Sequence, residues 1–160
     1  MKKRLLSILL LATLALSMVA CGGSEEGSKD KTKEVNAEDL AKSLAEDITY
    51  TGDMERLSDD DLEWYIDIEE GVTGVVYQVD GVSCEQVAVF SVPNKDAADG
   101  VIASLEELLV DMEQQNAAYD AKVSSRIENA VLEHKGDYVI LCVSDDSAKA
   151  KEIIKEAFGE

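Results

Sequence analysis

The sequence predicts an α+β fold, a two-layer sandwich in which a four-stranded antiparallel sheet made of two hairpins carries helices mainly on one face. Two pairs of apolar segments are each joined by a turn sequence, Asp80-Gly81 in one pair and Lys135-Gly136-Asp137 in the other. Amphipathic segments with helical spacing lie before, between and after these pairs. The predicted order is therefore α-α-β-β-α-β-β-α, in a single globular domain over residues 36–160.

Two helices are expected before the first strand. Asn36 can cap the first of them. Its apolar stripe has helical spacing and comprises Leu40, Ala41, Leu44, Ala45 and Ile48. Ser58 precedes three aspartates and is expected to begin a second, short helix, because acidic residues suit the positive end of a helix. The buried side of this second helix is formed by Leu62, Tyr65 and Ile66.

The first hairpin is expected over Val72–Val79 and Cys84–Val92, which are rich in valine and other apolar residues. Asp80-Gly81 between them is typical of a tight turn that needs positive φ. Pro93 is expected to end the second strand.

The longest helix is expected to begin at Asp96, after the first hairpin. One face of it is apolar and comprises Ala98, Val101, Ile102, Leu105, Leu108, Leu109 and Met112. After Tyr119 the pattern indicates a connection, with a further helical turn through Val123 and Ile127 as an alternative.

The second hairpin is expected over Ala130–His134 and Tyr138–Val143. Its second strand is continuously apolar, which indicates a central strand covered on at least one side. Ser144-Asp145-Asp146 is expected to cap a last helix. The inward side of that helix comprises Ala150, Ile153, Ile154, Ala157 and Phe158.

The first 20 residues have the pattern of a secretory signal peptide. Lys2, Lys3 and Arg4 form a positive start, and the uncharged apolar run Leu5–Ala20 follows. A membrane-spanning helix needs about 20 apolar residues, and this run is shorter. We therefore predict a cleavable signal peptide over residues 1–20.

Cys21 stands directly after Met18-Val19-Ala20, and this arrangement resembles the lipobox of bacterial lipoproteins. The resemblance implies cleavage between Ala20 and Cys21 and acylation of the Cys21 thiol. Two acyl chains hold a protein firmly on a bilayer, at about 0.8 kcal/mol per buried methylene. The expected location is the extracytoplasmic face of the cell membrane, with the lipid bilayer as a partner through acylated Cys21. An ordinary signal peptide followed by an incidental cysteine is the alternative.

Residues 21–35 are expected to form a lipidated flexible linker, because Gly22–Val35 is rich in Gly, Ser and mixed charge. Such a segment spans roughly 20 Å root-mean-square. Loss of the three basic residues of the signal peptide leaves 12 basic and 34 acidic groups, a net charge of −22. Anionic lipid repels such a domain, so the linker is expected to hold it away from the bilayer.

The composition excludes several classes of function. With 15 basic and 34 acidic residues the chain is unsuited to nucleic acid, whose phosphates require Lys and Arg. Three Cys and one His leave little for a zinc site, and we predict no cofactor or metal. His134 is expected to face solvent outside any catalytic triad. Gly71-Val72-Thr73-Gly74 lacks the further Gly and the Lys of a phosphate-binding loop.

Acidic clusters are common in this chain and carry little information individually. Asp59-Asp60-Asp61 with Glu63 suggests Ca²⁺, but Trp64 occupies the loop position at which an EF-hand requires Gly. Helix capping accounts for this cluster and for Asp145-Asp146. A pair of carboxylates for glycoside hydrolysis stays open, although no spacing selects one.

Two cysteines and one tryptophan remain. Cys84 and Cys142 are expected to be two thiols without a disulfide, because Cys142 lies inside an apolar strand. Trp64 is expected in the core or at its rim rather than as a platform for sugar rings.

Three segments carry a family resemblance: Ser83–Phe90, Asn129–Val131 and Gly136–Asp146. Together with the long acidic helix they resemble a family of uncharacterised lipoproteins of Gram-positive bacteria, a domain of unknown function, over residues 38–158. The first motif of that family tends to carry an Asp-Glu pair where this chain has Glu85-Gln86, so the charge of that Glu is absent here. The resemblance supports location and domain limits and implies no catalytic residue.

The expected function is that of a membrane-anchored lipoprotein whose domain binds a protein or small-molecule partner without catalysis. Two alternatives stay open: a small extracytoplasmic hydrolase that uses carboxylates, and an accessory subunit of a membrane complex. Two facing carboxylates in a cleft would favour the hydrolase. A contiguous exposed apolar patch would favour the subunit. Cys21, with cleavage after Ala20, is the one functional position that the sequence predicts.

Overall fold

The computed structural model describes residues 35–160 except 68, 82 and 117–119. The described part contains five helices and five strands, which confirms the α+β class. In chain order they are α1 (Ala37–Asp47), β1 (Met54–Arg56), α2 (Asp59–Tyr65), β2 (Thr73–Val79), β3 (Gln86–Ser91), α3 (Lys95–Asn116), α4 (Ala121–Glu128), β4 (Val131–Lys135), β5 (Tyr138–Val143) and α5 (Ser147–Phe158).

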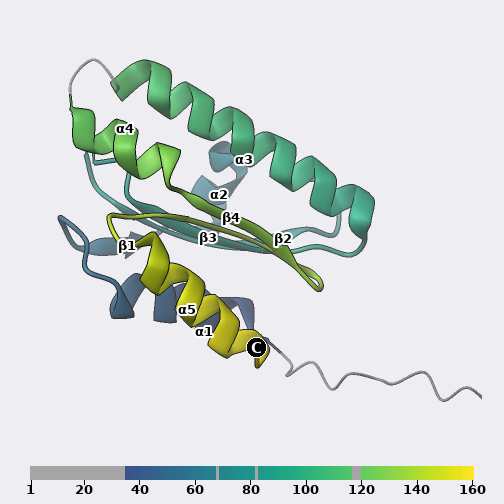
Figure 1. Ribbon diagram of the computed structural model, residues 1–160. Coiled ribbons are helices and arrows are strands. Elements are labelled where there is room, and N and C mark those ends of the chain that lie inside the picture. Colours follow the sequence, from purple (N-terminus) through teal and green to yellow (C-terminus); the bar gives the residue numbers. More distant parts are fainter. Residues whose placement is uncertain (1–34, 68, 82, 117–119) are drawn as a thin grey trace, which may run out of the picture. The chain divides into compact units, whose positions relative to one another are not determined.

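The strands form one antiparallel sheet with the order β1-β2-β3-β5-β4 (Figure 1). The expected number of four strands was wrong, because β1 adds a fifth strand at the edge beside β2. Met54 lies opposite Val79 and Glu55 lies opposite Gln78 in this pairing. β1 has three residues, too few to show a strand period in the sequence.

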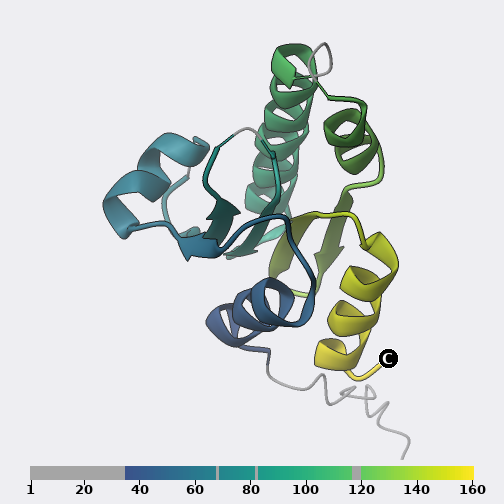
Figure 2. The ribbon, with the colours of Figure 1, turned by 90° about the vertical axis from the view of Figure 1, so that its left-hand side faces the viewer.

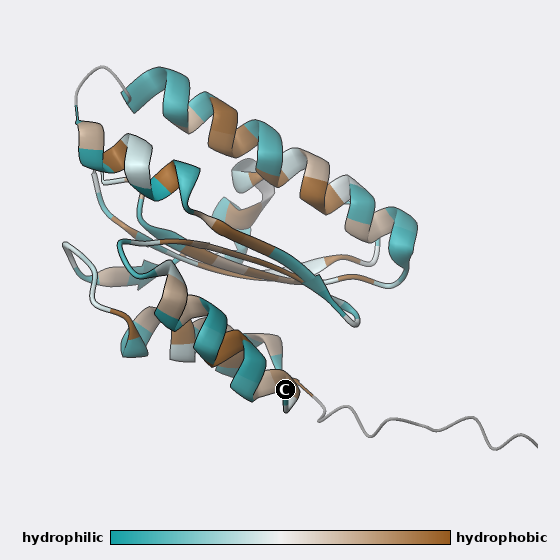
Figure 3. Ribbon diagram, viewed as in Figure 1, coloured by the Kyte–Doolittle hydropathy of each residue, from teal (hydrophilic) through white to brown (hydrophobic). Residues whose placement is uncertain are grey.

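Helices cover both faces of the sheet, so the predicted two-layer arrangement with helices mainly on one face was also wrong. α1 and α5 lie on one face, and α2, α3 and α4 lie on the other (Figures 1 and 2). β3 and β5 explain this arrangement, because they are apolar on both sides (Figure 3). Val87 and Val89 pack towards α1 and α5, whereas Ala88 and Phe90 pack towards α3. Side chains alternate along a strand, so both faces of such strands need a cover.

Three helix caps are those that the sequence predicts. Asn36 accepts a hydrogen bond from the backbone N–H of Asp39 at 3.1 Å, and Ser58 accepts one from Asp61 at 3.2 Å. Asp146 caps α5 through the backbone N–H of Lys149 at 2.9 Å. The long helix α3 begins earlier than expected, because the side chain of Asn94 accepts from the backbone N–H of Ala97 at 2.9 Å.

The β2–β3 connection is longer than the tight turn that the sequence predicts. Gly81 has positive φ as expected, but β3 begins at Gln86 rather than at Cys84. The backbone N–H of Val79 donates to the carbonyl of Glu85 at 3.0 Å and closes the loop. Ser83, Cys84 and Glu85 therefore lie outside the regular strand, where their side chains can build a site.

Candidate functional site

An ion-pair network lies at the end of the sheet where β3 begins, with Glu85 and Arg126 buried and Asp145 exposed. The buried polar or charged residues of the described part are Glu85, Gln86, Arg126 and Ser144, each at most 5% exposed. A buried charge is costly unless it is paired and hydrogen-bonded. The partners of Glu85 and Arg126 must therefore compensate their buried charges, and these partners determine how this end of the domain is arranged.

Arg126 comes from α4 and is the centre of the network. Its Nε donates to Oδ1 of Asp145 at 2.7 Å and its Nη2 to Oδ2 at 2.9 Å, a two-point contact that fixes the guanidinium plane. Its Nη1 donates to the carbonyl of Ser83 at 3.2 Å. The hydrogen bond from Arg126 lowers the pKa of Asp145 below its usual range.

Glu85 is the second buried charge, 1% exposed, and it also joins separate segments. Its carboxylate accepts the backbone N–H of Thr51, with N–O distances of 3.1 and 3.3 Å, and the Thr51 hydroxyl. Oε1 of Glu85 lies 3.7 Å from Nε of Arg126. Cys84, immediately before it, has φ of 59°. A left-handed residue other than Gly persists only where its surroundings fix it.

A cavity of about 680 Å³ lies against this network. The segment before β1, the β2–β3 loop, the end of α3 and the start of α4 contribute its walls. The described lining residues are Thr51, Gly52, Val79, Asp80, Ser83, Asn116, Asp120, Lys122, Val123 and Arg126. We call this the end cavity. Thr51, Ser83 and Arg126 belong both to its wall and to the buried network, so the network fixes the wall in place.

A second hollow of about 480 Å³ lies beside β1 and α2. Trp64 lines it and is 88% exposed, so its expected place in the core or at the rim of the core was wrong. Glu55 and Gln78, which lie opposite each other in the β1–β2 ladder, both line it. We call this the Trp64 hollow. Asp80 lines the Trp64 hollow as well as the end cavity.

Tyr65 follows Trp64 in α2 but is held inside the fold. Its hydroxyl donates to Oε1 of Gln86 at 2.7 Å, and Nε2 of Gln86 donates to Sδ of Met112 at 3.1 Å. Burial raises the pKa of Tyr65 above its usual range. Gln86 thus holds α2 and α3 on the sheet.

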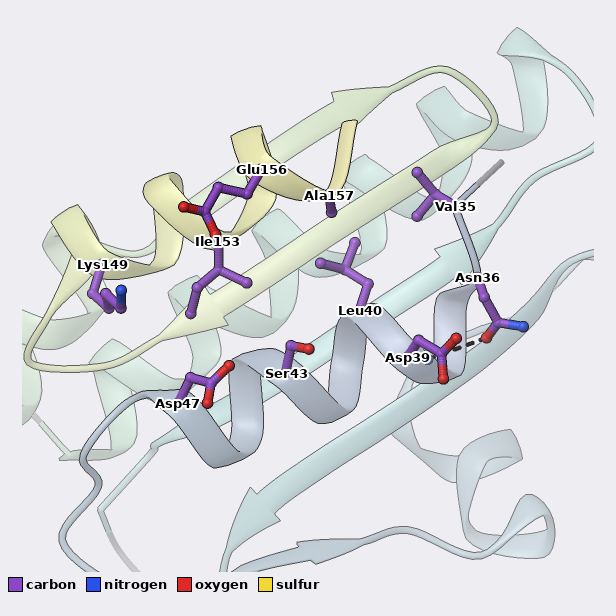
Figure 4. Close-up of a pocket in the computed structure, with 10 residues that line it drawn as sticks. All are labelled: Val35, Asn36, Asp39, Leu40, Ser43, Asp47, Lys149, Ile153, Glu156 and Ala157. Atoms are coloured by element: carbon purple, nitrogen blue, oxygen red, sulfur yellow. Dashed lines mark hydrogen bonds between the residues drawn. The ribbon is translucent and has the colours of Figure 1, made fainter. Parts of the chain in front are cut away.

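A third hollow of about 340 Å³ lies between α1 and α5 (Figure 4). The figure shows Leu40 of α1 and Ile153 of α5 between the two helices, with Asp47 and Lys149 at one end. It has half the volume of the end cavity, and neither Glu85 nor Arg126 lines it. The end cavity is therefore the better candidate for a ligand site.

The predicted functional position cannot be placed. Ala20, Cys21, the signal peptide and all of the linker except Val35 lie outside the described residues. Within those residues, no helix has the length and apolar character to cross a membrane.

Other positions considered in the sequence lie as follows. His134 is exposed on the edge strand β4, as expected. Asp59-Asp60-Asp61 form the first turn of α2, and the described side chains include no group of three or more His, Cys, Asp or Glu that could hold a metal. Cys84 and Cys142 are not joined to each other by a disulfide. The hydroxyl of Tyr50 lies 3.7 Å from Sγ of Cys142.

Sequence reasoning missed the network itself. Asp145 was expected to be a helix cap with Asp146, but its carboxylate pairs with Arg126 and Asp146 alone caps α5. Arg126 carried one usable signal. It lies within the amphipathic stretch that contains Val123 and Ile127, one residue from the apolar stripe. No single-sequence pattern connects it to Glu85 or to Thr51.

The structure thus defines a small α+β domain with helices on both sheet faces and an ion-paired cavity at one end of the sheet. The chain belongs to the family described as a domain of unknown function (DUF4358), whose family model matches residues 46–144. The match begins within α1 and ends just after β5, so it includes Thr51, Glu85 and Arg126. No curated protein matches the chain, and no solved structure does.

Proposed function

We propose that this protein is a non-enzymatic binding domain held on the extracytoplasmic face of the cell membrane through acylated Cys21, and that the end cavity is its ligand site. The cavity, with its wall fixed by Glu85, Arg126 and Asp145, is the observation that carries the proposal. Its volume lies within the range of about 300–1,000 Å³ typical of small-molecule sites.

The arrangement of charge supports binding over hydrolysis. The two carboxylates of the network already have partners, because Asp145 accepts two hydrogen bonds from Arg126 and Glu85 accepts those of Thr51. A general acid or base must exchange a proton with the substrate. A fixed wall instead lowers the ordering cost of binding, which is what a binding site requires.

The surface supports binding of a ligand over docking on a membrane complex. Within the described residues, the exposed large apolar side chains are Trp64 on α2 and Val110 on α3. Docking surfaces are contiguous patches of several hundred Å². Two single residues on separate helices do not form such a patch.

The anchor rests on the lipobox resemblance and is tested by counting thiols. The purified mature protein, unfolded in denaturant, is expected to titrate two thiols, Cys84 and Cys142, because acylation blocks Cys21. Mass spectrometry should assign a diacylglyceryl group and N-terminal processing to Cys21. Cys21→Ala is the control and should leave the protein unprocessed or released from membranes. Three titratable thiols in processed wild-type material would contradict the anchor.

The binding site is tested by obstructing the cavity in the full mature chain, kept in detergent. Asn116→Phe places a ring at the cavity wall. Asn129→Phe is the matched control, because each amide donates to the carbonyl four residues earlier, Asn116 at 2.9 Å and Asn129 at 2.7 Å. A compound from a small-molecule thermal-shift screen should stabilise the wild type and Asn129→Phe but not Asn116→Phe. Equal stabilisation of all three would place binding elsewhere.

A further inference from the structure

We propose, resting on the binding function above, that the end cavity and the Trp64 hollow form one site for an organic cation, an ammonium group on an apolar stem. The two hollows meet at Asp80, which lines both. Three observations support this site: the shared Asp80, the acidic residues that line the hollows and the exposed indole of Trp64.

The two hollows adjoin along the β1–β2 edge of the sheet. The residue pair Glu55 and Gln78 lines the Trp64 hollow, and Val79, the next residue along β2, lines the end cavity. The side chains of Gln78 and Val79 point to opposite faces of the sheet, so Asp80, directly after β2, is the residue that the two hollows share. A ligand that occupies both hollows must therefore pass Asp80.

Among the described residues that line the hollows, two of the three cations are already neutralised. Arg56 donates from Nε and Nη2 to both carboxylate oxygens of Glu38, each at 3.2 Å, and its Nη1 lies 3.6 Å from Asp59. Arg126 is held in the same way by Asp145, with Glu85 adding a second negative charge. Neither guanidinium therefore offers net positive charge to a ligand.

The remaining charged lining residues favour a cation. Those described are Glu55, Asp61, Asp80 and Asp120 on the acidic side, and Lys122 on the basic side. Asp61 also accepts the Ser58 hydroxyl at 2.6 Å, a contact that leaves its charge in place. Concave acidic surfaces concentrate field lines and attract positive ligands. Lys122 is the one of these groups that opposes this attraction.

Trp64 provides the apolar contact that an ammonium ligand requires. Tryptophan is on average a highly buried residue, yet this indole is 88% exposed at the rim of an acidic hollow. The face of an indole attracts cations through its quadrupole and also covers methylene groups. The exposed ring and the acidic lining therefore favour the same ligand chemistry.

Trp64 is the only tryptophan in the chain, so its fluorescence reports directly on this site. The full mature chain in detergent is titrated with 1,5-diaminopentane and with Nα-acetyl-lysine methylamide. These two probes carry the same ammonium chemistry, as a free amine and as a lysyl side chain. Pentanoate and pentanol serve as anionic and neutral controls. We expect saturable fluorescence changes with the two cations and none with pentanoate or pentanol. The cation that binds more tightly shows whether the ligand is a free amine or a lysyl side chain.

Variants separate a site from general attraction to an acidic protein. Asp80→Asn should weaken cation binding by about fivefold, the size of one partly exposed charge pair. Asp137→Asn removes an equally exposed charge at the β4–β5 turn and should change the Kd little. Lys122→Gln should tighten cation binding, because it removes the opposing charge.

Three results would overturn the proposal: no fluorescence change with either cation, equal weakening by Asp80→Asn and Asp137→Asn, or weaker cation binding by Lys122→Gln. The binding function has its own test. If a neutral or anionic compound stabilises the wild type and not Asn116→Phe while both cations leave Trp64 unchanged, the cavity binds a ligand and the cation proposal alone is wrong.

Discussion

The two ends of the sheet are built in opposite ways. At the cavity end, Glu85, Arg126 and Asp145 enclose charge beside a hollow. At the turn end, where β4 meets β5, the rings of Tyr138 and Phe158 lie edge to face at 6.0 Å between centroids. Lys135 lies with its Nζ 5.8 Å from the centre of the Phe158 ring. The cavity end therefore has paired charges beside a hollow, whereas the turn end is packed with aromatic rings.

The difference shows that stability alone does not account for the buried ion pair at the cavity end. Burying a charge pair stabilises a fold no better than apolar packing of the same size. The turn end shows that this chain can close a sheet end with apolar contacts. The cavity end keeps its ions, which agrees with a wall that must hold its shape around a ligand.

The largest expected effect comes from breaking the buried pair. Arg126→Met leaves Glu85 as an uncompensated buried charge and should lower the free energy of unfolding by about 3–5 kcal/mol. Lys135→Met makes the same substitution at the turn end, and its cost should be about 0–1 kcal/mol. Urea denaturation of both full-length variants measures the contrast. Similar losses of unfolding free energy in the two variants would mean that the ion pair of Glu85 and Arg126 does not stabilise the cavity wall.

A loss of packing at the turn end should leave the cavity intact. Phe158 is 9% exposed and contacts Tyr138, so Phe158→Ala should cost about 3 kcal/mol. We expect an unchanged Kd for any ligand of the end cavity, measured below the lowered unfolding temperature. A Kd that changes together with stability would show that the two ends of the sheet are coupled, and would contradict the expectation that they are independent.

Acid should act on the cavity end through Asp145. Because Arg126 lowers the pKa of Asp145, the charged carboxylate stabilises the fold above about pH 4, and this contribution is lost as the pH falls further. Asp145→Asn should therefore unfold at lower urea than the wild type at pH 7, with a gap that narrows towards pH 3. In an Arg126→Met background the gap should have no such pH dependence. A constant gap in the wild-type background would contradict the pairing.

The smallest effect concerns the rate at which thiols react. Burial raises the pKa of both Cys84 and Cys142, so each is mainly protonated at neutral pH and reacts slowly. Cys142 is 1% exposed in the central strand β5, whereas Cys84 is half-buried in the β2–β3 loop. A disulfide reagent should label Cys84 first and Cys142 only on unfolding, and Cys84→Ser should remove the fast phase. Labelling of both at one rate would show that the core opens readily.

The elements that the sequence predicts are those with a period or a cap. The stripe of α1 and the continuous apolar run of β5 both carry a local signal, and Asn36 and Ser58 mark where helices begin. The edge strand β1 carries none, because three residues cannot show a period. The second helical layer was within reach. An apolar run without alternation in both β3 and β5 is typical of a sheet covered on two faces.

The candidate site was beyond local patterns for a different reason. Thr51, Glu85, Arg126 and Asp145 come from four segments, with sequence separations of 34 residues for Thr51–Glu85 and 19 for Arg126–Asp145. Each residue has an ordinary local interpretation: loop, strand, helix and cap. Only the fold shows that Asp145 and Glu85 approach the same guanidinium. The site is therefore defined by contacts between segments that are distant in the sequence, and no local sequence pattern marks it.

The hydroxyl of Tyr138 donates to the carbonyl of Val35, which joins the first described residue to the turn end of the sheet. Anything attached upstream of Val35 leaves the domain at that pole. The end cavity, which Arg126 lines, lies at the opposite end of the sheet. A flexible linker does not fix how the domain faces the bilayer. Its attachment at the other end of the sheet nevertheless keeps the proposed tether away from the end cavity, so the anchor and the ligand do not compete for the same part of the domain.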